Sequence, residues 1–187
     1  SYAHVTRVAH FAEKIMADLG YPRRMQELAW IAGYMHDIGN VINRIDHAQS
    51  GAVMAFRILD RMNFPPEEIA AIVTAIGNHD EGTGQPVSAF AAALILADKS
   101  DVRRSRVRDK ATVALDIHDR VNYSVTDCHL EFDEQRTSIR LILTVDTELG
   151  SVMEYLEIFM KRMLLCQKAA QALGLIFHLV INGQLLV

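Results

Sequence analysis

The chain has 187 residues, half of them hydrophobic, which is enough for one large domain or for a domain with a small appendage. Its formal net charge of −4 and its pI near 6.0 argue against a general nucleic-acid binder. No apolar run reaches the roughly 18 residues that a membrane span needs. Two cysteines without metal-ligand spacing and no visible signal peptide lead us to expect a reducing cytoplasm.

Helical spacing of apolar residues opens the chain. Residues 2–19 keep this spacing, and Gly20-Tyr21-Pro22 ends the predicted helix. A second helix is predicted over 23–37, and it leads into Tyr34-Met35-His36-Asp37-Ile38-Gly39-Asn40. Gly39 is expected to end this run as a C-terminal glycine. A frayed helix end would let the adjacent His and Asp turn to one site, although neighbours on a helix point about 100° apart.

Three more helices are predicted before residue 104. One begins at His47 with Asp46 as its N-cap, one covers 67–78 after a double proline, and one covers 87–103. The last of these is the most apolar in the chain and is expected to be central. It carries Asp98, and a carboxylate buried there is costly unless it is paired or metal-bound.

The pattern changes after about residue 110. A poorly patterned helix is followed by two segments of period two, which predict a β-hairpin, and then by a long amphipathic helix and a last strand. These elements are predicted at 109–123, 125–132, 139–145, 149–173 and 175–181, with a turn at 133–136 and Gly174 after the long helix. We therefore predict a mainly α protein with a helical domain at 1–110 and a small C-terminal α+β (β-β-α-β) unit at 111–187.

Histidine and aspartate recur on the successive N-terminal helices. The order is His4, His36-Asp37, His47, His79 and Asp98. This combination resembles the HD-domain family of metal-dependent phosphohydrolases, over roughly residues 1–108. The flanking segments agree with the resemblance: His4-Val5-Thr6-Arg7-Val8-Ala9, His36-Asp37-Ile38-Gly39, His47-Ala48-Gln49-Ser50-Gly51 and Ala97-Asp98-Lys99. The resemblance implies an HD-domain helical bundle.

Imidazole and carboxylate donors suit Fe, Mn, Zn, Co or Ni, and we favour Fe or Mn. One ion would need only His4, His36, Asp37 and Asp98, so the remaining His47 and His79 make sense with a second ion about 3.5–4 Å away, bridged by Asp37. The six-residue pattern is similar to the dinuclear branch of the family. It implies hydrolysis of a phosphate ester or anhydride of a nucleotide or related small molecule by a metal-activated hydroxide, with Asp37 and Asp98 as catalytic residues. The alternative is a non-catalytic regulatory or partner-binding module with a structural metal.

Several polar side chains near these ligands are candidates for binding a small phosphorylated substrate. They are Arg7, Asn40, Arg44, Lys99 and Arg104. Arg binds phosphate bidentately, but cations that follow Asp98 are equally explained as a solvated helix end. Asn40 stands where many HD proteins carry Lys, so phosphate anchoring there departs from the family pattern.

Other features receive structural roles. His10, His118, His129 and His178 are interpreted as structural, and the long C-terminal helix is expected to pack on its own sheet. A homodimer interface is the alternative role for that helix.

Overall fold

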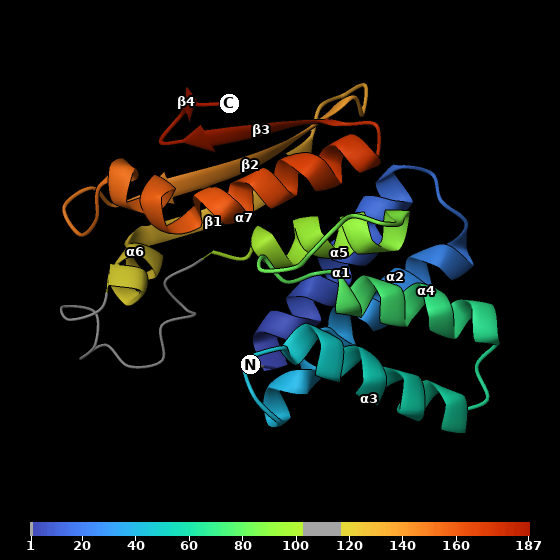
Figure 1. Cartoon of the computed structure of the whole chain (residues 1–187). Helices are drawn as coiled ribbons and strands as arrows, with labels where there is room; N and C mark the ends of the chain where they lie inside the picture. The colour runs from blue at the N-terminus through green and yellow to red at the C-terminus, as the bar shows by residue number, and fades with distance from the viewer. Residues whose placement is uncertain (1, 103–116) are drawn as a thin grey trace. The chain divides into compact units, whose positions relative to one another are not determined.

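The computed structural model describes residues 2–102 and 117–187, and the chain divides into two compact units, Ser1–Asp98 and Lys99–Val187 (Figure 1). The first unit is helical and the second holds the β-sheet. This confirms a mainly α protein with a small C-terminal α+β part. The predicted boundary near residue 110 lies in the stretch outside the described residues and stays a prediction.

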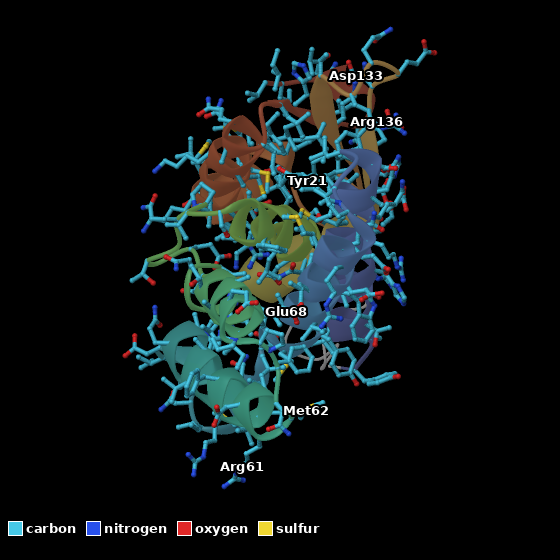
Figure 2. All side chains as sticks on the ribbon, turned by 90° about the vertical axis from the view of Figure 1, so that its right-hand side faces the viewer. Tyr21, Arg61, Met62, Glu68, Asp133 and Arg136 are labelled. Carbon is cyan, nitrogen blue, oxygen red and sulfur yellow. The ribbon has the colours of Figure 1, made fainter. Side chains whose placement is uncertain are left out.

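The first unit is a bundle whose helices begin and end close to the predicted positions. They are α1 (Tyr2–Asp18), α2 (Arg23–Met35), the short 3-10 helix η1 (Ile38–Val41), α3 (His47–Arg61), α4 (Pro66–Gly77) and α5 (Ala89–Lys99), whose last residue belongs to the second unit. In Figure 1, α1 lies against α2 and α3 against α4. At the far end of α3, the exposed Arg61 and Met62 project away from the ribbon (Figure 2).

The apolar stripe of α1 is buried, as its spacing predicts, whereas Val53 and Phe56 of α3 are exposed. In α1, Val8, Ala12 and Met16 are fully buried. In α5, every residue of 91–97 is fully buried, which agrees with the expectation from its composition. This helix is shorter than the predicted 87–103, and Arg103 lies outside the described residues.

Gly39 does not end α2, which corrects the prediction for this position. The helix ends at Met35 with His36 as its C-cap, and Gly39 lies inside η1 without a positive φ. Its lack of a side chain serves a close approach instead: a Cβ there would overlap the carbonyl oxygen of His47 and lie 2.6 Å from the Gly51 nitrogen.

Asp46 precedes α3 as predicted, but its side chain does not cap the helix. The residue has a left-handed backbone (φ 56°, ψ 26°) and makes no side-chain capping hydrogen bond. This conformation, which Asp tolerates better than most residues, turns the chain from the loop into α3. The helix start was therefore right and the predicted reason for it was wrong.

The second unit is a β-sheet with one long helix. Its elements are α6 (Ile117–Ser124), β1 (Val125–Phe132), β2 (Ser138–Val145), α7 (Val152–Ala172), β3 (Ile176–Ile181) and the short β4 (Gln184–Leu185). The described strands form the order β1-β2-β3-β4, with β1 antiparallel to β2, β2 parallel to β3, and β3 antiparallel to β4. This confirms the predicted hairpin, long helix and last strand, while β4 was not predicted.

Local side-chain hydrogen bonds stabilise one turn and one helix start in this unit. Asp133 accepts hydrogen bonds from the Thr137 and Ser138 backbone nitrogens at 2.7 and 2.8 Å, which closes the turn that Figure 2 labels at Asp133 and Arg136. Ser151 and Glu154 form a capping box at the start of α7. Helix α7 packs on β3 and β2, as expected for its apolar face. Among the described residues, no helix combines the length and apolarity that crossing a bilayer requires.

Candidate metal centre

All six candidate ligands lie in the first unit, each near the end of a helix or just beyond one. His4 lies in the first turn of α1, His36 and Asp37 follow α2, His47 begins α3, His79 follows α4, and Asp98 is near the end of α5. Helix ends leave backbone groups unpaired and let the chain bend, so neighbouring residues there can face one point. The histidines and Asp98 are buried, and the Asp37 side chain is 21% exposed.

Asp98 is a buried carboxylate whose oxygen lies close to two histidine nitrogens. Its Oδ1 lies 3.2 Å from His4 Nε2 and 3.5 Å from His36 Nε2. Donor atoms of these three buried residues lie within 4.8 Å of one another, so one cation could contact them all. The sequence argument for Asp98 required a compensating partner, and these imidazoles provide part of it.

The two oxygens of Asp37 face different histidines. Oδ2 lies 3.8 Å from His4 Nε2 and 3.7 Å from His36 Nε2, while Oδ1 lies 3.6 Å from His47 Nε2. His36, Asp37 and His79 also form a group whose donor atoms lie within 4.8 Å of one another. The carboxylate therefore stands between two sets of nitrogen donors, which is the arrangement that a bridging ligand needs.

Backbone carbonyls fix the ring orientation of three histidines. The Nδ1 atoms of His36, His47 and His79 lie 2.6, 3.0 and 2.6 Å from the carbonyl oxygens of the residues three positions earlier. A carbonyl only accepts, so each Nδ1 carries the proton and the neutral ring offers its Nε2 lone pair to the cluster. Metal-bound histidines are commonly oriented in this way.

Two features of the cluster favour a cation. The Nε2 atom of His36 is buried and makes no hydrogen bond with any described residue. The Nε2 atoms of His47 and His79 lie 3.2 Å apart, and two lone pairs at that distance repel unless a proton or a metal ion lies between them. The donor set of imidazoles and carboxylates therefore fits divalent transition-metal ions.

Charge within the cluster favours an ionised Asp37. Burial acts to raise the pKa of Asp37, and so does the nearby carboxylate of Asp98, but electrostatic interaction with His36, His4 and His79 lowers it by more. The pKa of Asp37 consequently lies below its ordinary value. A carboxylate that stays charged is the form that binds a cation.

Asp80 is a candidate ligand that the sequence analysis missed. Its Oδ1 lies 3.9 Å from His47 Nε2, so it adds a carboxylate beside His47 and His79. The signal available in the sequence was the repeated His-Asp dipeptide, since His79-Asp80 follows α4 as His36-Asp37 follows α2. In the structure, both histidines also donate to a carbonyl oxygen three residues earlier.

Glycines let the ligand-bearing segments approach closely. A Cβ on Gly33 would lie 2.7 Å from the Ala9 Cα, so this glycine lets α2 lie against α1 near His4 and His36. Gly39 has the corresponding role between η1 and α3. Backbone contacts of this kind cannot be relieved by moving a side chain, so they fix the distances between ligands.

The predicted substrate-binding residues differ in their surroundings. Asn40 donates to Asp37 Oδ1 at 2.7 Å, and the side chain of Arg44 is 64% exposed with Nη1 3.8 Å from the same oxygen. Arg7 is half-buried one turn after His4, and Lys99 is 3% exposed. Arg104 lies outside the described residues. Among the predicted cations that the structure describes, Arg44 is thus the one that combines an exposed side chain with a position 3.8 Å from a cluster oxygen.

A shallow groove on α1 and α2 lies outside the cluster. Its volume is about 430 Å³, and Trp30 forms part of its lining together with Arg23 and Arg24. Both arginines are already paired with carboxylates, including Arg24 with Glu68 at 2.6 Å. The groove therefore has less phosphate-binding capacity than the surface beside Arg44.

Comparison with protein families gives a match to the HD domain over residues 1–127. The chain belongs to the HD-domain family. HD domains bind divalent metal ions and are generally metal-dependent hydrolases, which agrees with the donor set described above. No curated protein and no solved structure gave a match to this HD-domain chain.

Proposed function

We propose that this HD-domain protein is a phosphohydrolase with two divalent metal ions, which cleaves a phosphate ester or anhydride of a nucleotide or related small molecule. The observation that carries the proposal is the position of Asp37, whose oxygens face His4 and His36 on one side and His47 on the other. A single ion beside Oδ2 would leave Oδ1 of Asp37, and the His47 that it faces, without a metal to bind.

The residues divide into two groups around Asp37. His4, His36 and Asp98 would hold the first ion, and His47 and His79 would hold the second, with Asp37 shared. Fe or Mn suits this set best, and Zn, Co and Ni are compatible with it. When bound, the ions would lower the pKa of a water molecule so that it serves as the nucleophile near neutral pH.

The chain itself contributes charge and orientation. Asp37 and Asp98 supply negative charge at the buried centre, and the carbonyl contacts hold the histidine rings in one tautomer. Arg44 lies beside Asp37 with its guanidinium exposed, where it can bind phosphate oxygens and stabilise charge that develops on them. Arg7 is a second candidate for this role.

The compartment proposed is a reducing cytoplasm. Both cysteines, Cys128 and Cys166, are present as thiols. Thiols persist where glutathione and thioredoxin keep proteins reduced.

A substrate panel tests the proposed function. Protein purified without chelators is assayed with added Mn or Fe against nucleotides, dinucleoside polyphosphates and generic phosphate esters. We expect turnover of at least one nucleotide substrate, which is lost on chelation and restored by the metal. Two bound ions without turnover of any phosphate compound would instead favour a non-catalytic module with a structural metal.

A further inference from the structure

Asn40 occupies a position that sequence analysis assigned to substrate binding, but its side chain faces a metal-ligand candidate. Its Nδ2 donates to Asp37 Oδ1 at 2.7 Å and to the Asp37 carbonyl oxygen at 3.1 Å. Both donor directions of the amide are therefore directed to one residue. An amide committed in this way has little capacity left to donate to a phosphate.

The contact with Arg44 indicates which atom of the Asn40 amide faces Asp37. Arg44 Nη1 lies 3.5 Å from Asn40 Oδ1, and a guanidinium only donates. The amide oxygen therefore faces the cation and the amide nitrogen faces the Asp37 carboxylate. The reverse orientation would place the oxygen against a carboxylate and the NH2 against a guanidinium, and both contacts would be repulsive.

The oxygen that Asn40 contacts is the one that faces His47. Asp37 Oδ1 lies 3.6 Å from His47 Nε2, whereas Oδ2 faces His4 and His36. A carboxylate can rotate about its Cβ–Cγ bond, because such terminal torsions are broad. The hydrogen bond from Asn40 opposes that rotation and keeps Oδ1 directed toward the His47 side.

We propose that Asn40 is a positioning residue that orients the Asp37 carboxylate as a bridge and thereby sets the affinity of the second metal site, at His47 and His79. The inference rests on the proposed two-ion function. The first site has Asp98 as a second carboxylate and buried histidines, so it depends less on the orientation of Asp37. Loss of a hydrogen bond to a metal ligand typically weakens metal affinity about 10–100-fold.

The test is a Co(II) titration of the metal-free protein, monitored by visible absorption and by calorimetry. Wild type is compared with Asn40→Ala and with Asn40→Leu, which keeps the branched shape but removes the amide. We expect two binding steps in wild type, and in both variants an unchanged first step with a second step weakened about 10–100-fold. Asn43→Ala is the matched control, since Asn43 is likewise exposed, lies just after η1 and accepts from the Ile45 nitrogen.

The possible results separate the inference from the function on which it rests. Unchanged affinities in both variants overturn the role of Asn40 and leave the two-ion proposal intact. Equal weakening of both steps, with a lower melting temperature of the metal-free protein, shows a general structural role and also overturns it. A wild type that binds fewer than two Co(II) ions overturns the two-ion proposal itself, and the inference with it.

Discussion

Asp37 is the residue through which the two halves of the candidate metal centre are connected. Its oxygens face different histidines, and its pKa lies below the ordinary value because, despite burial, the nearby imidazoles favour the charged form. Asn40 holds one of these oxygens from outside the cluster. A change at Asp37 should therefore affect both sites, whereas a change at any single histidine should affect one site more than the other.

Replacing Asp37 by Asn keeps the shape of the side chain but removes its charge and one strong ligand oxygen. We expect loss of at least one bound metal ion and a decrease in turnover of about a thousandfold or more, comparable to removing a major electrostatic stabiliser. Elemental analysis and the substrate panel measure the two effects. Asp60→Asn, an exposed position on α3, is the control. Near wild-type turnover in Asp37→Asn would refute the metal mechanism.

Gly39→Ala tests the close approach of η1 to α3. The new methyl group would overlap the His47 carbonyl oxygen, so the backbone must shift, at a cost of about 1–3 kcal/mol. We expect a lower free energy of unfolding in urea and weaker metal binding. The fluorescence of Trp30, the only tryptophan of the chain, reports unfolding of the first unit.

Gly77→Ala is the matched control for this substitution. It adds a methyl group at the end of α4, where the Cβ would be in ordinary contact, 3.6 Å from the Ala52 Cβ. We expect unchanged metal binding and a stability equal to wild type or higher by up to about 1 kcal/mol. Equal destabilisation by the two substitutions would show that the contact at Gly39 has no special role.

Helix ends are the elements on which both units depend. In the first unit they carry the candidate ligands, and three of the histidines there donate to the backbone of the last turn or of the preceding loop. In the second unit, the start of α7 is fixed by Ser151 and Glu154, and Glu154 also contacts Arg120 of α6 at 2.5 Å. The backbone nitrogen of Ser151 and the Arg120 side chain lower the pKa of Glu154.

Glu154→Gln isolates the charge at this helix start, since Gln can still complete a capping box. The folded-state pKa is below the ordinary value of 4.5, so the stabilisation is present above that pH and is lost as pH falls through the folded-state pKa. We expect the variant to melt below wild type at pH 7 and the difference to narrow at pH below 4.5. Circular dichroism melts across this range measure it, and a difference independent of pH would contradict the explanation.

At the scale of the whole molecule, the six candidate ligands are confined to one of the two units. All lie within Ser1–Asp98, while the second unit contributes the sheet and α7. Met153, Met160 and Leu164 leave an exposed apolar stripe on α7, so a homodimer stays a prediction that light scattering can check. Because all six candidate ligands lie in the first unit, metal binding should stabilise mainly that unit.

Metal addition should raise the melting temperature reported by Trp30 fluorescence. A ligand that binds only the native state at a free concentration of 100 Kd stabilises it by about 2.7 kcal/mol. We expect this shift with Mn or Fe, its reversal by a chelator, and a smaller shift in Asp37→Asn. A midpoint that does not respond to metal would place the binding site outside the unit that contains Trp30.

Much of the fold was predictable because local spacing records which face of an element is buried. The apolar period of 3.6 in the first hundred residues and the period of two in β1 and β2 led to the correct elements, within a few residues at their ends. The short β4 was missed because two residues carry no period. Asp46 was misread because Asp is common both as an N-cap and in the left-handed region, which it adopts here. Gly39 was misread because glycine serves both at helix C-termini and at close backbone contacts.

The sequence alone also determined which residue types could form the metal centre, since His and Asp recur at successive helix ends. Only the tertiary structure decided how they combine: which Asp37 oxygen faces His47, that Asp80 lies beside the same histidine, and that Asn40 contacts Asp37. These relations join segments from different helices, or depend on how a side chain rotates. They are fixed by helix packing and by contacts such as that of Gly39 with the start of α3, which no local periodicity contains.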